Sequence, residues 1–189
     1  MLQHFFASAG LCKPWWLINN ERGLTVIQNL KRAPYICGGL TGLREGIKKS
    51  AKVFYERVAE ALEDITGQRP FVPHKHYDPE EHKDFTPAQV DAAERQQVCC
   101  HTSVVIAVTL APSWGGGIEV EMANHAGVPV ILLCQEYMLD QRLISRLLRG
   151  NPAVKMVILY ANESQAIAKL LLAREEINAL INHNNAVVI

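Results

Sequence analysis

The sequence lacks an excess of charge of either sign. Lysine plus arginine and aspartate plus glutamate each number 19 among the 189 residues, so the formal net charge is zero with neutral histidines. A chain without a basic surplus has no global field to gather nucleic acid polymers or to coat an anionic membrane. It also contains no apolar run near the roughly 18 residues that a membrane helix needs. We therefore expect neither a nucleic acid polymer nor a membrane as partner.

Cysteines are few and irregularly spaced. The five cysteines are odd in number and show none of the paired spacings of a zinc site or a redox motif. Cys37 and Cys134 lie inside apolar runs, where a thiol behaves as a small hydrophobic group. The N-terminus has neither a basic start nor a long apolar stretch, so we expect no signal peptide and a cytoplasmic protein. We expect no metal either, because a closed zinc set does not fit the spacing of His74, His76 and His82.

Length and composition predict one globular domain. The chain is 49% hydrophobic and 20% charged, as is usual for a globular domain. Its length suffices for one core and is short for two. Regular patterning begins at residue 33, so we expect a domain over residues 33–189. Residues 1–32 form an N-terminal extension whose order the sequence does not indicate.

From residue 33 onward, short apolar runs alternate with amphipathic segments. The apolar runs predict strands at 33–37, 69–73, 103–111, 128–134 and 154–160. The segments between them predict helices at 46–67, 86–101, 118–127, 139–150 and 162–181. This alternation predicts an α/β fold, Rossmann-like or flavodoxin-like, with a five-stranded, mainly parallel sheet and helices on both faces. Ligands bind such sheets beyond the carboxyl ends of the strands, where the strand order reverses.

Three glycines, Gly115, Gly116 and Gly117, stand directly before a predicted helix and Glu119. A glycine-rich turn that enters a helix offers backbone N–H groups and the positive end of the helix dipole to a phosphate or another anion. We expect Glu119 in the first helical turn, where the dipole favours its ionised form and makes it a candidate nucleophile. The alternative is that the glycines only permit tight packing of strand and helix.

A second glycine cluster, GGLTGLR, follows the first predicted strand. Gly38 and Gly39 can contact a ligand through the backbone, and Thr41 and Arg44 add a hydroxyl and a cation. The cluster matches neither of the nucleotide-binding patterns GxxxxGK[ST] and GxGxxG. A tight turn between strand and helix explains it equally well.

Taken together, these segments resemble the nucleoside 2-deoxyribosyltransferase superfamily, and within it most of all the 2'-deoxynucleoside 5'-phosphate N-hydrolases. The resemblance rests on YICGGLTGLR (35–44), PHKHYDP (73–79), SVVIAVTLAPSWGGGIEVEMA (103–123), GVPVILL (127–133) and LISRLLRG (143–150). It implies an enzyme that needs no cofactor. Such an enzyme cleaves the N-glycosidic bond of a nucleoside or its 5'-monophosphate, by hydrolysis or by base exchange.

The resemblance also implies roles for single residues. Glu119 matches the nucleophile that attacks C1' of the sugar, and Tyr35 matches a tyrosine that hydrogen-bonds near it. Ser113, with the first glycine cluster and the three glycines before Glu119, matches the site of the 5'-phosphate. Ser145 matches a second phosphate-contacting serine, supplied by the neighbouring subunit. A homodimer with shared active sites is thus implied.

Two departures from the family pattern leave alternatives open. The family aspartate, about 24 residues before the nucleophile, falls on Arg95 here, and Glu94 is one residue away. As a longer replacement, Glu94 would activate the leaving base. Without such a group, the chain would be a nucleotide sensor that binds and does not cleave. Thr41 stands where the N-hydrolases tend to carry an arginine, which weakens the phosphate assignment.

Overall fold

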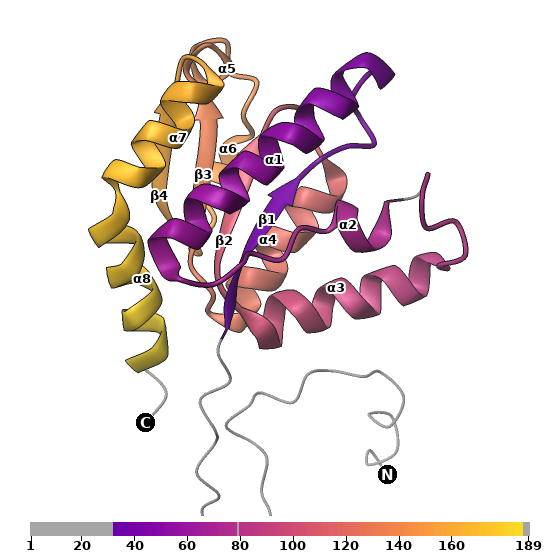
Figure 1. The fold of residues 1–189 in the computed structure, drawn as a ribbon, viewed down its shortest axis with the longest axis horizontal. Coiled ribbons are helices and arrows are strands. Elements are labelled where there is room, and N and C mark those ends of the chain that lie inside the picture. The colour runs from indigo at the N-terminus through magenta and orange to yellow at the C-terminus, as the bar shows by residue number, and fades with distance from the viewer. Residues whose placement is uncertain (1–31, 79, 187–189) are drawn as a thin grey trace, which may run out of the picture.

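Four parallel strands form one sheet in the computed structural model, which describes residues 32–78 and 80–186. The strands follow one another across the sheet in chain order: β1 (Ala33–Gly38), β2 (Thr102–Thr109), β3 (Val130–Gln135) and β4 (Val154–Tyr160) (Figure 1). The predicted α/β class with a parallel sheet is confirmed. The predicted extension, residues 1–32, lies outside the described residues except for Arg32.

The predicted strand at 69–73 is not a full member of the sheet. Phe71 forms an isolated parallel bridge with Tyr35, closed by two backbone hydrogen bonds of 2.8 and 2.9 Å. Pro70 and Pro73 flank this bridge and cannot donate to a ladder, which limits the pairing. The segment still lies beyond the free edge of β1. The chain therefore passes from one side of β1 to the other before β2, as in flavodoxin-like sheets, and the strand order reverses between β1 and β2.

Helices cover both faces of the sheet, as predicted (Figure 1). One face carries α1 (Glu45–Thr66), α7 (Glu163–Leu172) and α8 (Arg174–Ala186). The other carries α3 (Pro87–His101) and α4 (Trp114–Ala126). Short helices occur in the connections: α2 (His74–Tyr77), α5 (Glu136–Asp140) and α6 (Arg146–Arg149). The single helix predicted at 139–150 is thus wrong, and the one predicted at 162–181 is divided between α7 and α8.

The longer helices begin and end at the residues that cap them. The predicted start of α3 is confirmed, because Thr86 forms a capping box with Gln89 and Pro87 follows at the first position. Gly67 and Gly127 end α1 and α4 with φ angles of 70° and 71°, a left-handed conformation that favours glycine.

The predicted start of α4 is wrong. The helix begins at Trp114 because Ser113 is its N-cap, with the Ser113 hydroxyl oxygen accepting a hydrogen bond from the Gly116 N–H at 3.1 Å. The three glycines therefore form the first turn of the helix and do not precede it.

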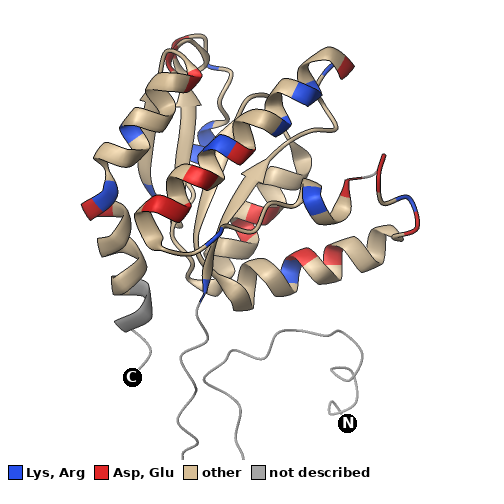
Figure 2. Cartoon of the chain, in the orientation of Figure 1, with Lys and Arg blue, Asp and Glu red and all other residues tan. Residues whose placement is uncertain are grey.

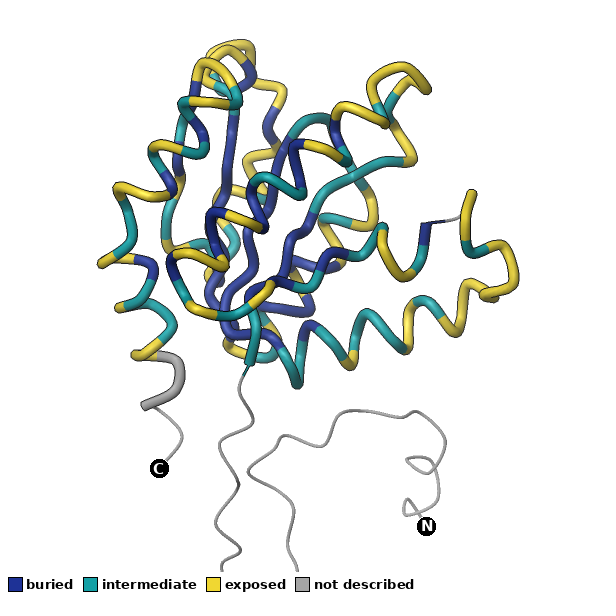
Figure 3. The backbone as a smooth tube through the Cα atoms, in the orientation of Figure 1, coloured by how far each residue is buried: buried dark blue, intermediate teal, exposed yellow. Residues whose placement is uncertain are grey.

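The core has two layers, one on each face of the sheet (Figure 3). Every residue of β2 is buried, as its apolar run predicts. Because side chains alternate along a strand, Ile36 points to the layer of α1, whereas Tyr35 and Cys37 point to the layer of α3 and α4. This alternation places the Tyr35 hydroxyl and the Cys37 thiol of β1 beside α4.

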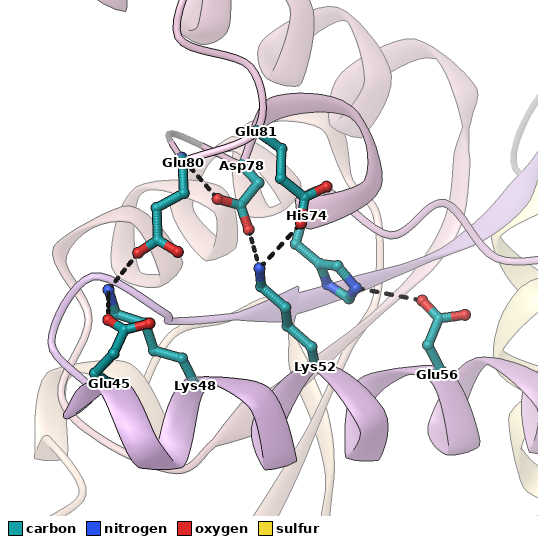
Figure 4. Close-up of polar contacts among 8 residues, drawn as sticks. All are labelled: Glu45, Lys48, Lys52, Glu56, His74, Asp78, Glu80 and Glu81. Atoms are coloured by element: carbon teal, nitrogen blue, oxygen red, sulfur yellow. Dashed lines mark hydrogen bonds and ion pairs between the residues drawn. The ribbon is translucent and has the colours of Figure 1, made fainter.

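Ion pairs fix the segment after α2 against α1 (Figure 4). Lys52 contacts the buried carboxylate of Asp78, and Lys48 contacts Glu80 at 2.7 Å. Burial alone would raise the pKa of Asp78, but hydrogen bonds from Lys52 and from backbone N–H groups outweigh it and lower that pKa. The ionised Asp78 therefore holds the chain in place where it leaves α2 towards α3.

Charged side chains of both signs occur along α1, with lysines mainly in its first half and acidic residues mainly in its second half (Figure 2). Within residues 32–78 and 80–186, no helix is both long enough and apolar enough to cross a membrane.

Candidate active site

Glu119 is buried between α4 and β1, with hydrogen-bond donors on both of its carboxylate oxygens. The Tyr35 hydroxyl donates to Oε1 at 2.5 Å, and the Cys37 thiol donates to Oε2 at 2.9 Å. Glu119 is 7% exposed. The predicted first-turn position is wrong because the helix starts earlier than expected. Glu119 is the sixth residue of α4, in its second turn.

Burial controls the protonation of this cluster. It raises the pKa of Glu119, and the hydrogen bonds from Cys37 and Tyr35 oppose that rise by stabilising the charged form. Burial thus acts in the opposite direction to the helix dipole, from which the sequence predicts an ionised Glu119. Burial, followed by the nearby negative charge of Glu119, also raises the pKa values of Tyr35 and Cys37. Both groups therefore keep their protons and remain donors.

Glu94 on α3 lies close enough to Glu119 for their charges to interact. Burial, and then the charges of Glu119 and Asp91, raise the pKa of Glu94 to about 7. A carboxyl with that pKa exchanges its proton near neutral pH. Arg95 points elsewhere, since adjacent helix positions lie about 100° apart, and it pairs with Asp91 at 2.8 Å. Of the two residues considered from the sequence, the structure brings Glu94 towards Glu119.

A pocket of about 880 Å³ opens at the carboxyl ends of β1 and β2. This is where the strand order reverses and where such sheets bind ligands. Six of the predicted binding residues line it: Gly38, Gly39, Ser113, Gly116, Gly117 and Ser145. Cys37 lines it too and contacts Glu119, so the carboxylate lies directly behind the pocket wall.

Three predicted binding residues do not line this pocket. Thr41, Arg44 and Gly115 are exposed, and none of them is part of its lining. Arg44 is the N-cap residue of α1, which places it at the far end of the glycine cluster.

Gly38 and Gly39 are required by close packing. A Cβ on Gly38 would lie 2.5 Å from the Tyr55 ring, and one on Gly39 would lie 2.6 Å from the Cβ of Ser113. Tyr55 also donates a hydrogen bond from its hydroxyl to the Gly39 carbonyl at 2.9 Å. The loop is thus held between α1 and the N-cap of α4, which brings its backbone to the pocket. Close packing accounts for these two glycines, whereas the alternative from the sequence is a tight turn.

Ser145 lines the same pocket as Ser113 within a single chain. It is the N-cap residue of α6, and its hydroxyl accepts a hydrogen bond from the Leu148 N–H at 3.4 Å. The resemblance instead predicts that Ser145 acts in the site of a neighbouring subunit.

The contact of Cys37 with Glu119 is not among the predictions from the sequence. The apolar run around Cys37 predicts only that its thiol behaves as a small hydrophobic group. The available signal was its spacing of two from Tyr35 on a strand, which puts both side chains on one face.

The three histidines of the segment after Pro73 do not come together. His74 contacts Glu56 at 3.4 Å, His76 stacks on Phe71 with ring centroids 4.4 Å apart, and His82 lies edge-on to Phe85. Among the described residues, no three or more histidine, cysteine, aspartate or glutamate side chains are placed to hold a metal ion.

The fold is shared with a solved structure. No protein-family model matches the chain, and no curated protein matches it. Among solved structures, it is similar to a CMP N-glycosidase of Clostridium botulinum, with a TM-score of 0.54 and 21% identity over 75% of this chain and 98% of the other. A conserved protein of Enterococcus faecalis V583 gives a TM-score of 0.46 and 13% identity over 81% and 98%. At such identity, the first likeness shows a shared fold.

Proposed function

We propose that the protein cleaves the N-glycosidic bond of a nucleoside 5'-monophosphate, of the ribo or deoxy series, through Glu119. The observation that carries the proposal is the Glu119 carboxylate, with a donor on each oxygen, behind the wall of a pocket at the strand-order reversal. The fold shared with a CMP N-glycosidase supports the reaction class. Free nucleosides are the second substrate class that the resemblance implies, and base exchange is the second reaction.

In the proposed first step, a Glu119 oxygen attacks C1' while the bond from C1' to the base nitrogen breaks. The bonding electrons leave with the base, and protonated Glu94 supplies the proton that neutralises it. Positive charge develops on the sugar in the transition state, next to the carboxylate. Water then hydrolyses the sugar–Glu119 ester, releasing the sugar 5-phosphate. A second base in place of water would give the exchange reaction.

The start of α4 is the proposed anchor for the phosphate. Ser113 and Gly116 line the pocket at the N-terminus of this helix, where backbone N–H groups and the helix dipole favour an anion. The backbone of Gly39 lies against Ser113. Binding of the phosphate at this anchor would hold C1' in position for attack, although C1' lies elsewhere on the substrate.

Replacing Ser113 by glycine tests the phosphate anchor. Glycine is tolerated at an N-cap with a loss of only a few tenths of a kcal/mol, so the helix start is retained while the hydroxyl is lost. We expect KM for a 5'-monophosphate to rise about tenfold and KM for the matching nucleoside to change less than about twofold. Equal changes for both substrates, measured by steady-state kinetics, would remove Ser113 from phosphate binding.

We also propose a homodimer that covers the pocket rim. Trp114 is 94% exposed and Leu147 is 86% exposed, and both line the pocket. Ile118 and Leu143 add further exposed apolar surface beside them. Apolar side chains gathered at one site indicate an interface, and a second copy would bring another Ser145 to the rim, in agreement with the resemblance.

Light scattering after size exclusion tests the dimer with two matched variants. Leu147→Glu places a charge in the interface and should give a monomer, whereas Val53→Glu changes an exposed valine on α1 and should leave the dimer intact. A monomeric wild-type chain at micromolar concentration would contradict the proposed dimer.

A further inference from the structure

Strand β1 alone supplies both of the hydrogen-bond donors that the structure gives to Glu119. Tyr35 and Cys37 are two residues apart on this strand and reach opposite oxygens of the same carboxylate. The two donors fix the plane of the carboxylate as well as its position. Strand β1, which pairs with β2 at the edge of the sheet, therefore determines the orientation of the oxygens behind the pocket.

We propose that Cys37 is a positioning residue, whose thiol holds Oε2 of Glu119 in the orientation needed for attack on C1'. This inference rests on the proposed function. Cys37 also lines the pocket, so it is the link between the pocket wall and the buried carboxylate.

The surroundings of the thiol are built for this contact. The Cys37 sulfur lies 3.7 Å from the Gly116 carbonyl oxygen, and a Cβ on Gly116 would come within 3.3 Å of that sulfur. A side chain at position 116 would therefore press the sulfur away from its place. Gly116 therefore has a second role besides its place in the first turn of α4, because its lack of a side chain leaves room for the thiol.

As a hydrogen-bond donor to a nucleophilic carboxylate, a thiol is better suited than a hydroxyl. The S–H group is a weak donor, so it orients the carboxylate while withdrawing little of its charge. Among the described residues, titratable groups that interact with Glu119 include Tyr35 and Cys37 on β1, Glu94 on α3 and Tyr55 on α1. Of these four, Tyr35 and Cys37 donate hydrogen bonds to the carboxylate, and both are neutral.

Carbon-13 NMR titration of side-chain-labelled glutamate tests the contact without any need for activity. The Glu119 signal is assigned by its loss in Glu119→Gln. A donor to a carboxylate lowers its pKa, so Cys37→Ala should make Glu119 titrate at a higher pH than in the wild type. Cys37→Ser retains a donor and should titrate at the wild-type pH or below. The matched control is Cys134→Ala, which removes a buried thiol of β3 from the same core layer and should leave the titration unchanged.

Steady-state kinetics test the positioning role. We expect Cys37→Ala to lower kcat about tenfold, with KM within about twofold of the wild type and the acid limb of the pH profile moved to higher pH. Cys37→Ser should recover most of kcat. Titration of Glu119 at the wild-type pH in Cys37→Ala, or an equal rise in Cys134→Ala, would overturn the inference. A wild-type chain that releases no base from any nucleotide would instead contradict the proposed function, and the titration would still decide the Cys37 contact.

Discussion

Replacement of Glu119 by glutamine is expected to lower base release by about a thousandfold or more. Glutamine has nearly the same shape, but it cannot form the sugar ester or balance the positive charge on C1'. The fold should persist, because a neutral amide is easier to bury than a carboxylate with a raised pKa. The measurement is free base by chromatography, with the melting temperature of the same samples recorded.

The matched control for this variant is Glu60→Gln. Glu60 is an exposed residue of α1, on the other face of the sheet. Its replacement should leave base release within about twofold of the wild type, as expected of a surface change. Base release by Glu119→Gln at the rate of this control would exclude Glu119 from the reaction.

Replacement of Glu94 by glutamine is expected to lower kcat about a hundredfold at pH 6. The protonated form is the one that donates to the leaving base. Since the pKa of Glu94 is raised to about 7, wild-type activity should fall as the pH rises through that value. Ionised Glu119 is needed as well, so activity should also fall at low pH, and the two apparent values belong to the interacting pair. The glutamine variant should lack the fall at high pH.

Glu94→Gln should lower activity but raise the stability of the fold at high pH. The pKa of Glu94 is higher in the folded chain than in the unfolded chain, so the folded chain binds more protons between about pH 4.3 and about pH 7. Unfolding free energy therefore decreases as the pH rises through this window. Glutamine does not titrate, and above pH 7 the variant should be more stable than the wild type by on the order of 1–2 kcal/mol.

Arg95→Gln is the control for the helix that carries Glu94. Arg95 occupies the position at which the resemblance from the sequence places an aspartate, yet its side chain pairs with Asp91 on the surface. The variant should keep kcat within about twofold and keep the fall at high pH. A large loss in Arg95→Gln, with normal activity in Glu94→Gln, would reverse the assignment of the two residues.

Much of the fold follows from local sequence signals. The β-branched run of β2, the capping box at Thr86 and the glycine stops at Gly67 and Gly127 act within a few residues, and each matches the structure. The prediction of a full strand at 69–73 is wrong for a reason that is not local. Strand pairing depends on which neighbour the chain meets and on the prolines that flank Phe71, so an apolar run alone does not give the number of strands.

The site was harder to predict than the fold because its properties depend on burial and on contacts between distant residues. The glycines before Glu119 and the resemblance predict a nucleophile at this position, but the raised pKa of Glu119 follows from burial against β1. Cys37 and Glu119 are 82 positions apart in the chain, and no spacing rule connects them. The choice between Glu94 and Arg95 is made by the rotation of α3 about its axis, which a count of residues does not supply.

The most direct test of the proposed reaction is release of free base from 5'-monophosphates by the purified full chain. Ribo- and deoxyribonucleotides with each common base are incubated with and without a second acceptor base, and the products are separated by chromatography. We expect base and sugar 5-phosphate in equal amounts from at least one nucleotide in water alone, and none of either with Glu119→Gln. Release that requires the acceptor would identify base exchange. Nucleotides that raise the melting temperature and yield no base under either condition would contradict the account and indicate a nucleotide sensor.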